Sequence, residues 1–155
     1  MAQTLEPDPS LRRAIDNADA LWQEGSQKWF GVLSDDVVVY AATSVEPFEG
    51  RKAYEAHFGA RLTGGKRRSN AIARDIQMLE KDSAVVAQTL EIEEDELVAN
   101  VRQSVIWRRE GQGEWKIRHL HTTLLGSPSP AGGRALAQSG EGIRVLNERI
   151  ATMAA

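Results

Sequence analysis

Apolar residues recur with a helical period in the first 62 residues of the chain, and two helices are predicted there. After Ser10, a residue type that caps helices well, the first apolar series consists of Ile15, Ala18, Trp22 and Trp29, with Leu21 and Phe30 beside it. The second series lies in RKAYEAHFGARL at residues 51–62, where Tyr54, His57, Phe58 and Leu62 share one face. Between the two helices, the β-branched run VVVYAA predicts a strand.

The period changes to two after the glycines at positions 64 and 65, and four long strands are predicted from there on. They cover residues 69–80, 84–93, 97–109 and 114–125. Short turn-like segments separate the last three strands, so these are expected to form an antiparallel meander. Helix, strand, helix and then several strands is an α+β order, in which helices pack on one face of a curved antiparallel sheet and enclose a pocket.

The two ends of the chain differ in composition from this central part. Residues 1–9 contain two prolines and two acidic residues and are expected to form a flexible tail. The segment SPSPAGG, which begins at residue 127, is typical of a linker. Beyond it, Ile143, Leu146, Ile150 and Met153 recur at helical spacing. We therefore predict one domain at residues 10–126, followed at 127–155 by a linker and a C-terminal helix.

Two glutamines interrupt strand faces that are otherwise apolar. Gln88 falls in the series Ala84, Val86, Leu90 and Ile92, and Gln103 falls in the series Leu97, Ala99, Val101, Val105 and Trp107. A buried amide costs free energy unless it is hydrogen bonded, so both are expected to bind each other and nearby histidines, or a ligand or water. Trp29, Phe58 and Trp107 are predicted to join them in the pocket wall, the alternative being that they are core side chains.

His119 and His121 lie two positions apart near the end of the last predicted strand. Strand alternation places both on the same face as Trp115 and Ile117. Three interpretations are open: metal ligands, hydrogen-bonding or acid–base groups in a pocket, and structural histidines. A metal site needs a third ligand, and no carboxylate follows His121 at short spacing, so no metal is predicted.

Of these histidines, His121 is expected to face the pocket as a general acid or base, with His57 and Tyr40 as partners. His119, one step deeper in the strand, is expected to contribute to ligand binding and to be the more structural of the pair. A single extra residue in the strand would reverse this assignment.

Composition and charge exclude several classes of function. A chain of 155 residues is long enough for one domain with a sizeable core. It contains no cysteine, which excludes disulfides, thiolate zinc sites and cysteine nucleophiles. A net charge of -3 gives no overall attraction to nucleic acid or to an anionic membrane, and no segment resembles a membrane span or a signal peptide. A cytoplasmic protein without a cofactor is expected.

Two stretches resemble the nuclear transport factor 2-like superfamily: FEGRKAYEAHF at residues 48–58 and VIWRREGQGEWKIRHLHTTLLG at residues 105–126. The resemblance extends over residues 10–126 and implies the cone-shaped α+β fold of ketosteroid isomerase and the SnoaL-like cyclases. It is nearest to the association domain of calcium/calmodulin-dependent protein kinase II and its bacterial relatives. Leu90 and Val105 stand where those kinase domains have arginines, and no carboxylate stands near Tyr40, where the isomerases carry their base.

Two hypotheses about function follow from the resemblance and the pocket residues. The first is a protein that binds a small apolar or aromatic molecule and, if it is an enzyme, acts as a cofactor-free isomerase, dehydratase or cyclase through His121. The alternative is a non-catalytic module for homo-oligomerisation. A homodimer or a higher homo-oligomer is expected in either case, with the dimer contact through the outer face of the sheet, because Ile106 lies among polar residues there. Neither hypothesis involves nucleic acid or a membrane.

Overall fold

The computed structural model describes residues 5–63 and 67–130, which form two helices, a short 3-10 helix and one six-stranded sheet. The order is α1 (Pro9–Gln23), η1 (Gln27–Val32), β1 (Leu33–Tyr40), β2 (Phe48–Glu49), α2 (Arg51–Leu62), β3 (Arg67–Glu80), β4 (Ser83–Glu94), β5 (Leu97–Glu110) and β6 (Glu114–Pro130). The strand order is β2-β1-β6-β5-β4-β3. All neighbours pair antiparallel except β1 and β6, which are parallel.

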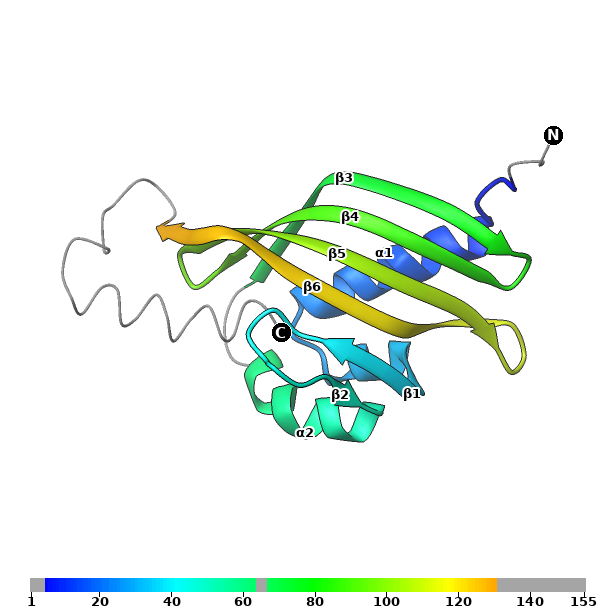
Figure 1. Cartoon of the computed structure of the whole chain (residues 1–155), viewed down its shortest axis with the longest axis horizontal. Helices are drawn as coiled ribbons and strands as arrows, with labels where there is room; N and C mark the ends of the chain where they lie inside the picture. Colours follow the sequence, from blue (N-terminus) through cyan, green and yellow to red (C-terminus); the bar gives the residue numbers. More distant parts are fainter. Residues whose placement is uncertain (1–4, 64–66, 131–155) are drawn as a thin grey trace.

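The predicted α+β architecture is confirmed. The long strands β3 to β6 form a curved sheet, α1 lies behind it in the view of Figure 1, and α2 lies below β1 and β2. The strand β6 continues to Pro130, through residues whose composition predicts a linker, because Val98 and Leu97 of β5 still pair with residues 129 and 130. The predicted C-terminal helix lies outside the described residues, and the domain boundaries remain predictions.

The first apolar series forms two elements and not the single helix that its spacing predicts. Asp8, and not Ser10, caps α1: its carboxylate accepts a hydrogen bond from the Ser10 amide at 2.8 Å, and Pro9 occupies the first turn. The helix ends because Gly25 has a φ of 65°, which lets the amides of Gly25 and Ser26 bond back to Trp22 and Leu21. Ser26 then caps η1.

Gly25 also permits a close approach between the ends of α1 and α2. A Cβ atom at this position would lie 2.6 Å from the carbonyl oxygen of Leu62. Next to this contact, the buried Arg67 guanidinium donates to the carbonyls of Arg61 and Leu62 and lies 3.2 Å from the Glu94 carboxylate. Residues from both helices and from two strands therefore meet at one buried point.

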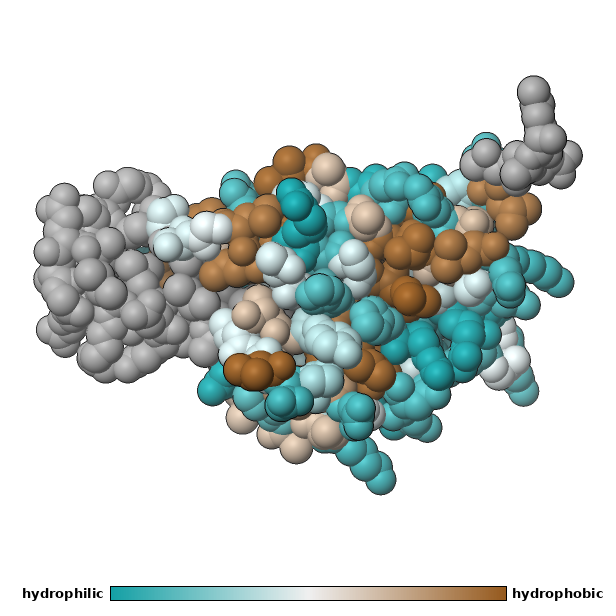
Figure 2. Space-filling model, viewed as in Figure 1, coloured by the Kyte–Doolittle hydropathy of each residue, from teal (hydrophilic) through white to brown (hydrophobic). Residues whose placement is uncertain are grey.

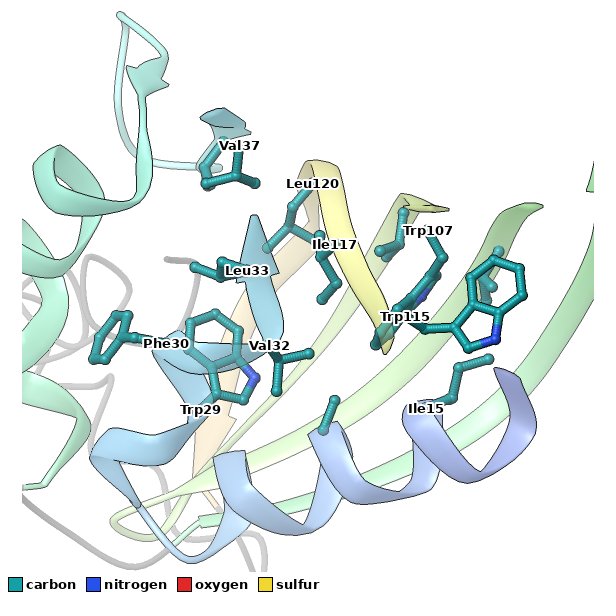
Figure 3. Close-up of a cluster of buried hydrophobic side chains, with 14 of the residues drawn as sticks. Ile15, Trp29, Phe30, Val32, Leu33, Val37, Trp107, Trp115, Ile117 and Leu120 are labelled. Carbon is teal, nitrogen blue, oxygen red and sulfur yellow. The ribbon is translucent and has the colours of Figure 1, made fainter. Parts of the chain in front are cut away.

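The core occupies the concave side of the sheet. Figure 3 shows Trp107 and Ile117 of the sheet facing Ile15 of α1, with Trp29 and Phe30 of η1 on the other side of the cluster. Below this layer, the rings of Trp29, Phe30, Tyr54 and Phe58 pack with centroids 5.4 to 6.5 Å apart. These contacts attach α2 to the sheet, since Tyr54 and Phe58 are both completely buried.

A β-bulge in β6 changes which side chains face the core. Ile117 pairs with Trp107, and His119 pairs with Ile106, so Arg118 is an extra residue without a partner of its own on β5. Before the bulge Trp115 and Ile117 are buried, and after it the buried residues are Leu120 and Thr122. The predicted strand alternation is therefore wrong beyond residue 117, and both histidines of this strand face outward.

Candidate ligand pocket

A small cavity of about 70 Å³ lies between α1 and the concave face of the sheet. Its wall is mostly apolar and includes the indoles of Trp22, Trp29 and Trp107. The polar side chains in the wall are Asp19, Ser69, Gln88 and Gln103. Of the predicted ligand-binding residues, the structure thus places Trp29, Trp107, Gln88 and Gln103 around one space, and their role in binding remains a prediction. The volume accommodates a few water molecules or part of a small organic molecule.

Four hydrogen-bonded side chains cross the sheet next to this cavity, one from each of β3, β4, β5 and β6. We call Arg74, Gln88, Gln103 and Thr122 the polar row. Nε of Arg74 donates to Oε1 of Gln88 at 2.7 Å, Nε2 of Gln88 donates to Oε1 of Gln103 at 2.8 Å, and Nε2 of Gln103 donates to Oγ1 of Thr122 at 3.2 Å. Each pair occupies directly opposed positions on neighbouring strands.

Arg74 fixes the direction of the whole polar row. A guanidinium has donors and no acceptor, so Gln88 must turn its carbonyl toward Arg74 and its NH₂ group toward Gln103. Gln103 must then turn its own NH₂ group toward Thr122. Each amide uses one N–H in the row, so the second N–H of each is not engaged in it. The glutamines bind each other, as in the first of the two predicted arrangements, and Arg74 and Thr122 take the places which that arrangement gives to histidines.

Asp19 on α1 closes the row at its charged end. The second edge of the Arg74 guanidinium, at Nη2, donates to Oδ2 of Asp19 at 2.8 Å, and the two side chains are 20% and 33% exposed. Burial raises the pKa of the Asp19 carboxyl above its ordinary value, and the hydrogen bond and charge of Arg74 offset part of this rise. Asp19 is thus a partly desolvated acid whose charged form is stabilised by Arg74.

Three of these polar residues were not predicted as site residues. Asp19 could have been found, because it follows Ile15 by four positions and precedes Trp22 by three, which places an acid within the apolar face of the helix. Arg74 gives a weaker signal, since a bulge between Ala71 and Ala73 shifts the alternation of β3. Thr122 could not be found without the bulge at Arg118.

The three predicted catalytic residues lie away from the cavity. His121 is exposed on the outer face of the sheet, and its ring centroid lies 5.7 Å from that of Tyr40, which is 42% exposed. His119 is half-buried on the same face, 5.6 Å from Tyr40. His57 is exposed on α2 and stacks on Phe48 with centroids 4.5 Å apart. The predicted location of His121 and His119 in the pocket is wrong, because the bulge reverses the strand alternation.

The pKa of His119 depends on its burial and on its neighbour His121. Partial burial lowers the pKa of His119 below its ordinary value, and the charge of His121 lowers it further.

The predicted ligand-binding residue Phe58 also lies away from the cavity, in the aromatic core between α2 and η1. Among the residues that the structure describes, no group of three or more His, Asp or Glu side chains gathers in an arrangement that could hold a metal ion.

The fold and the pocket define a class of protein: an α+β cone whose curved sheet holds a small cavity against its N-terminal helix. A comparison with models of known families gives no match, and a comparison with curated proteins gives none either. Solved structures show that this is the nuclear transport factor 2-like fold, as the resemblance predicts. None of the helices within the described ranges is long and apolar enough to cross a membrane.

Three solved structures illustrate the range of proteins with this fold. A nuclear transport factor 2-like protein of unknown function from Pseudomonas putida is 20% identical, with a TM-score of 0.65, over 73% of this chain and 82% of its own. A candidate scytalone dehydratase from Novosphingobium aromaticivorans is 13% identical, with a TM-score of 0.65, over 81% and 93%. A candidate calcium/calmodulin-dependent protein kinase II association domain from Xanthomonas campestris is 20% identical, with a TM-score of 0.63, over 81% and 96%. At these identities the likeness establishes the fold.

Proposed function

We propose that this protein binds a small, largely apolar molecule in the cavity on the concave side of the sheet. The observation that carries the proposal is the polar row beside an indole-lined cavity, with an unused N–H on Gln88 and on Gln103. Apolar cavities with a few fixed polar groups are the usual form of small-molecule sites. The aromatic wall favours a ligand with an apolar or aromatic ring, and the glutamines favour a hydrogen-bond acceptor on that ring.

If the site is catalytic, its proton-transfer group is Asp19 and not a histidine. Among the described residues in the cavity wall, Asp19 is the one side chain that titrates near neutral or acidic pH. The candidate scytalone dehydratase among the structural neighbours supports a dehydration as the class of reaction. The polar row would then supply hydrogen bonds to an oxygen on which negative charge develops.

A thermal-shift screen of small neutral aromatic and polyketide-like compounds tests the binding function. A ligand at one hundred times its Kd should stabilise the folded state by about 2.7 kcal/mol. The Gln103→Leu variant should lose this response, since it removes an amide from the centre of the row. Gln77→Leu is the matched control, because Gln77 is exposed on β3 and hydrogen bonds Asp75. Equal binding by wild type and Gln103→Leu would contradict the proposed site.

Homo-oligomerisation is a second candidate function, supported by the outer face of the sheet. There, Val38 and Ile106 lie opposite His119 on its two neighbouring strands, and Tyr40 lies opposite His121. Figure 2 shows apolar side chains among polar ones over the strands on this side. One structural neighbour is a candidate kinase association domain. This surface would join two copies through apolar and aromatic contacts.

Sedimentation velocity at micromolar concentration tests the second function. We expect a dimer or a larger assembly for the wild type, and a monomer for Ile106→Glu, because a carboxylate in the middle of an apolar interface is costly to bury. Asn100→Glu is the control, since Asn100 is an exposed residue nearer the other end of the same strand. A monomeric wild type would contradict oligomerisation through this face.

A further inference from the structure

The electrostatic character of the cavity depends on one ion pair. Asp19 is the single charged side chain among the described residues of the wall. Its partner Arg74 stands just outside the wall, and both edges of its guanidinium are engaged, one with Asp19 and one with Gln88. The two formal charges cancel, so the cavity and its polar border together are neutral.

The atoms that remain available in the cavity suit a neutral polar group. The unused N–H groups of Gln88 and Gln103 can donate to a carbonyl oxygen, and the second lone pairs of their own carbonyls can accept from an amide. A carboxylate would meet the Asp19 carboxylate and the glutamine carbonyl oxygens while Arg74 is already paired. Like charges placed together in a partly desolvated site repel strongly.

We propose that the Asp19–Arg74 ion pair sets the charge selectivity of the cavity, so that it accepts neutral molecules with a carbonyl or amide group and rejects carboxylates and ammonium ions. This inference rests on the proposed binding function and specifies the ligand class. Asp19 and Arg74 act here as specificity determinants. Removing either one leaves the charge of the other without its counter-ion, and the preferred charge of the ligand changes accordingly.

Fluorine NMR with three matched probes tests the inference. The probes para-fluorobenzamide, para-fluorobenzoate and para-fluorobenzylammonium share one ring and differ in the charge of the polar group. At neutral pH the wild type should bind the amide at least about tenfold more tightly than either ion, because Asp19 and Arg74 neutralise each other and leave no free counter-ion for a buried charge. In Asp19→Asn the benzoate should gain at least about tenfold in affinity, because Arg74 is then free to pair with it.

Two further variants separate this effect from a general change in charge. Glu55→Gln removes one negative charge from a side chain that is exposed to solvent on α2, and should keep the wild-type preference. Arg74→Gln should shift the preference toward the ammonium probe, since the Asp19 carboxylate loses its counter-ion. Arg74→Gln also provides an independent measurement should Asp19→Asn fold poorly.

The outcomes distinguish the inference from the function on which it rests. Benzoate binding by the wild type as tight as amide binding would overturn the charge selectivity and leave the binding function intact. An Asp19→Asn protein that folds and keeps the wild-type preference would also overturn it. If no probe binds the wild type or any variant, the binding function and the selectivity both fall.

Discussion

Replacing Gly25 with alanine tests the junction where α1, α2 and β3 meet. The backbone φ of 65° at this position costs an alanine about 1–2 kcal/mol. The new Cβ would also lie 2.6 Å from the carbonyl oxygen of Leu62. That oxygen cannot move freely, because Leu62 is completely buried and its carbonyl accepts from Arg67. Overpacking of this kind costs about 1–3 kcal/mol, so we expect a total loss of roughly 2–5 kcal/mol.

Urea denaturation measured by tryptophan fluorescence gives the free energy of unfolding for this variant. Gly31→Ala is the matched control, because no atom lies within 4 Å of the Cβ that it would add and its φ is not positive. It should be neutral or stabilising by about 0.5–1 kcal/mol. If the two variants differ by less than about 0.5 kcal/mol, which is within the range of ordinary surface substitutions, the proposed tight junction is refuted.

Three other variants or titrations have definite expected results. Arg67→Met should lower the free energy of unfolding by about 3–5 kcal/mol in urea denaturation, because it removes the guanidinium from the buried Glu94; a loss below about 1 kcal/mol, typical of a surface pair, would contradict this. Tyr54→Phe should leave stability unchanged or raise it by about 1 kcal/mol, since the buried hydroxyl has no hydrogen-bond partner among the described residues; a clear loss in the same assay would show that the hydroxyl is bonded. In an NMR titration His119 should have a pKa below its ordinary 6.5, and His121→Ala should raise this pKa. Because the pKa is lower in the folded state, the contribution of His119 to stability is lost as the pH falls through the folded pKa. A midpoint at or above 6.5 would contradict the lowered pKa.

The fold could be predicted from the sequence because its signals are long and repeated. The four strands from β3 to β6 are each at least twelve residues long, and a single exception does not hide the alternation in strands of this length. The helix at residues 51–62 is predicted equally clearly, since Tyr54, Phe58 and Leu62 recur every four residues, and the structure buries all three completely. Gly25 shows the limit of prediction from apolar spacing, because the helical spacing of apolar residues continues past Gly25 although the helix ends before it.

The site could be predicted only in part because it depends on local irregularities. The position of the glutamines in the cavity wall is predicted, since each one interrupts a regular apolar series, and both line the cavity. The predicted face of the histidines is wrong because Arg118 is an extra residue in the strand, and its bulge has no signature in the sequence. The Asp19–Arg74 pair joins residues 55 positions apart in the chain, and no periodicity within a single element can predict which partner a charged side chain will meet.

The position of the polar row has a consequence for how the strands find their correct alignment during folding. A slip of two residues between β4 and β5 would keep every apolar side chain on the concave face, but it would set Gln88 opposite Val101 or Val105. The buried amides would then lack partners, at a cost of about 1–3 kcal/mol each. Hydrophobic burial alone barely distinguishes such slipped hairpins from the native one. The polar row is therefore hydrogen bonded only when the strands at the centre of the sheet are in the native register. A version with leucines in its place would bury as much apolar surface but would not disfavour the slipped registers.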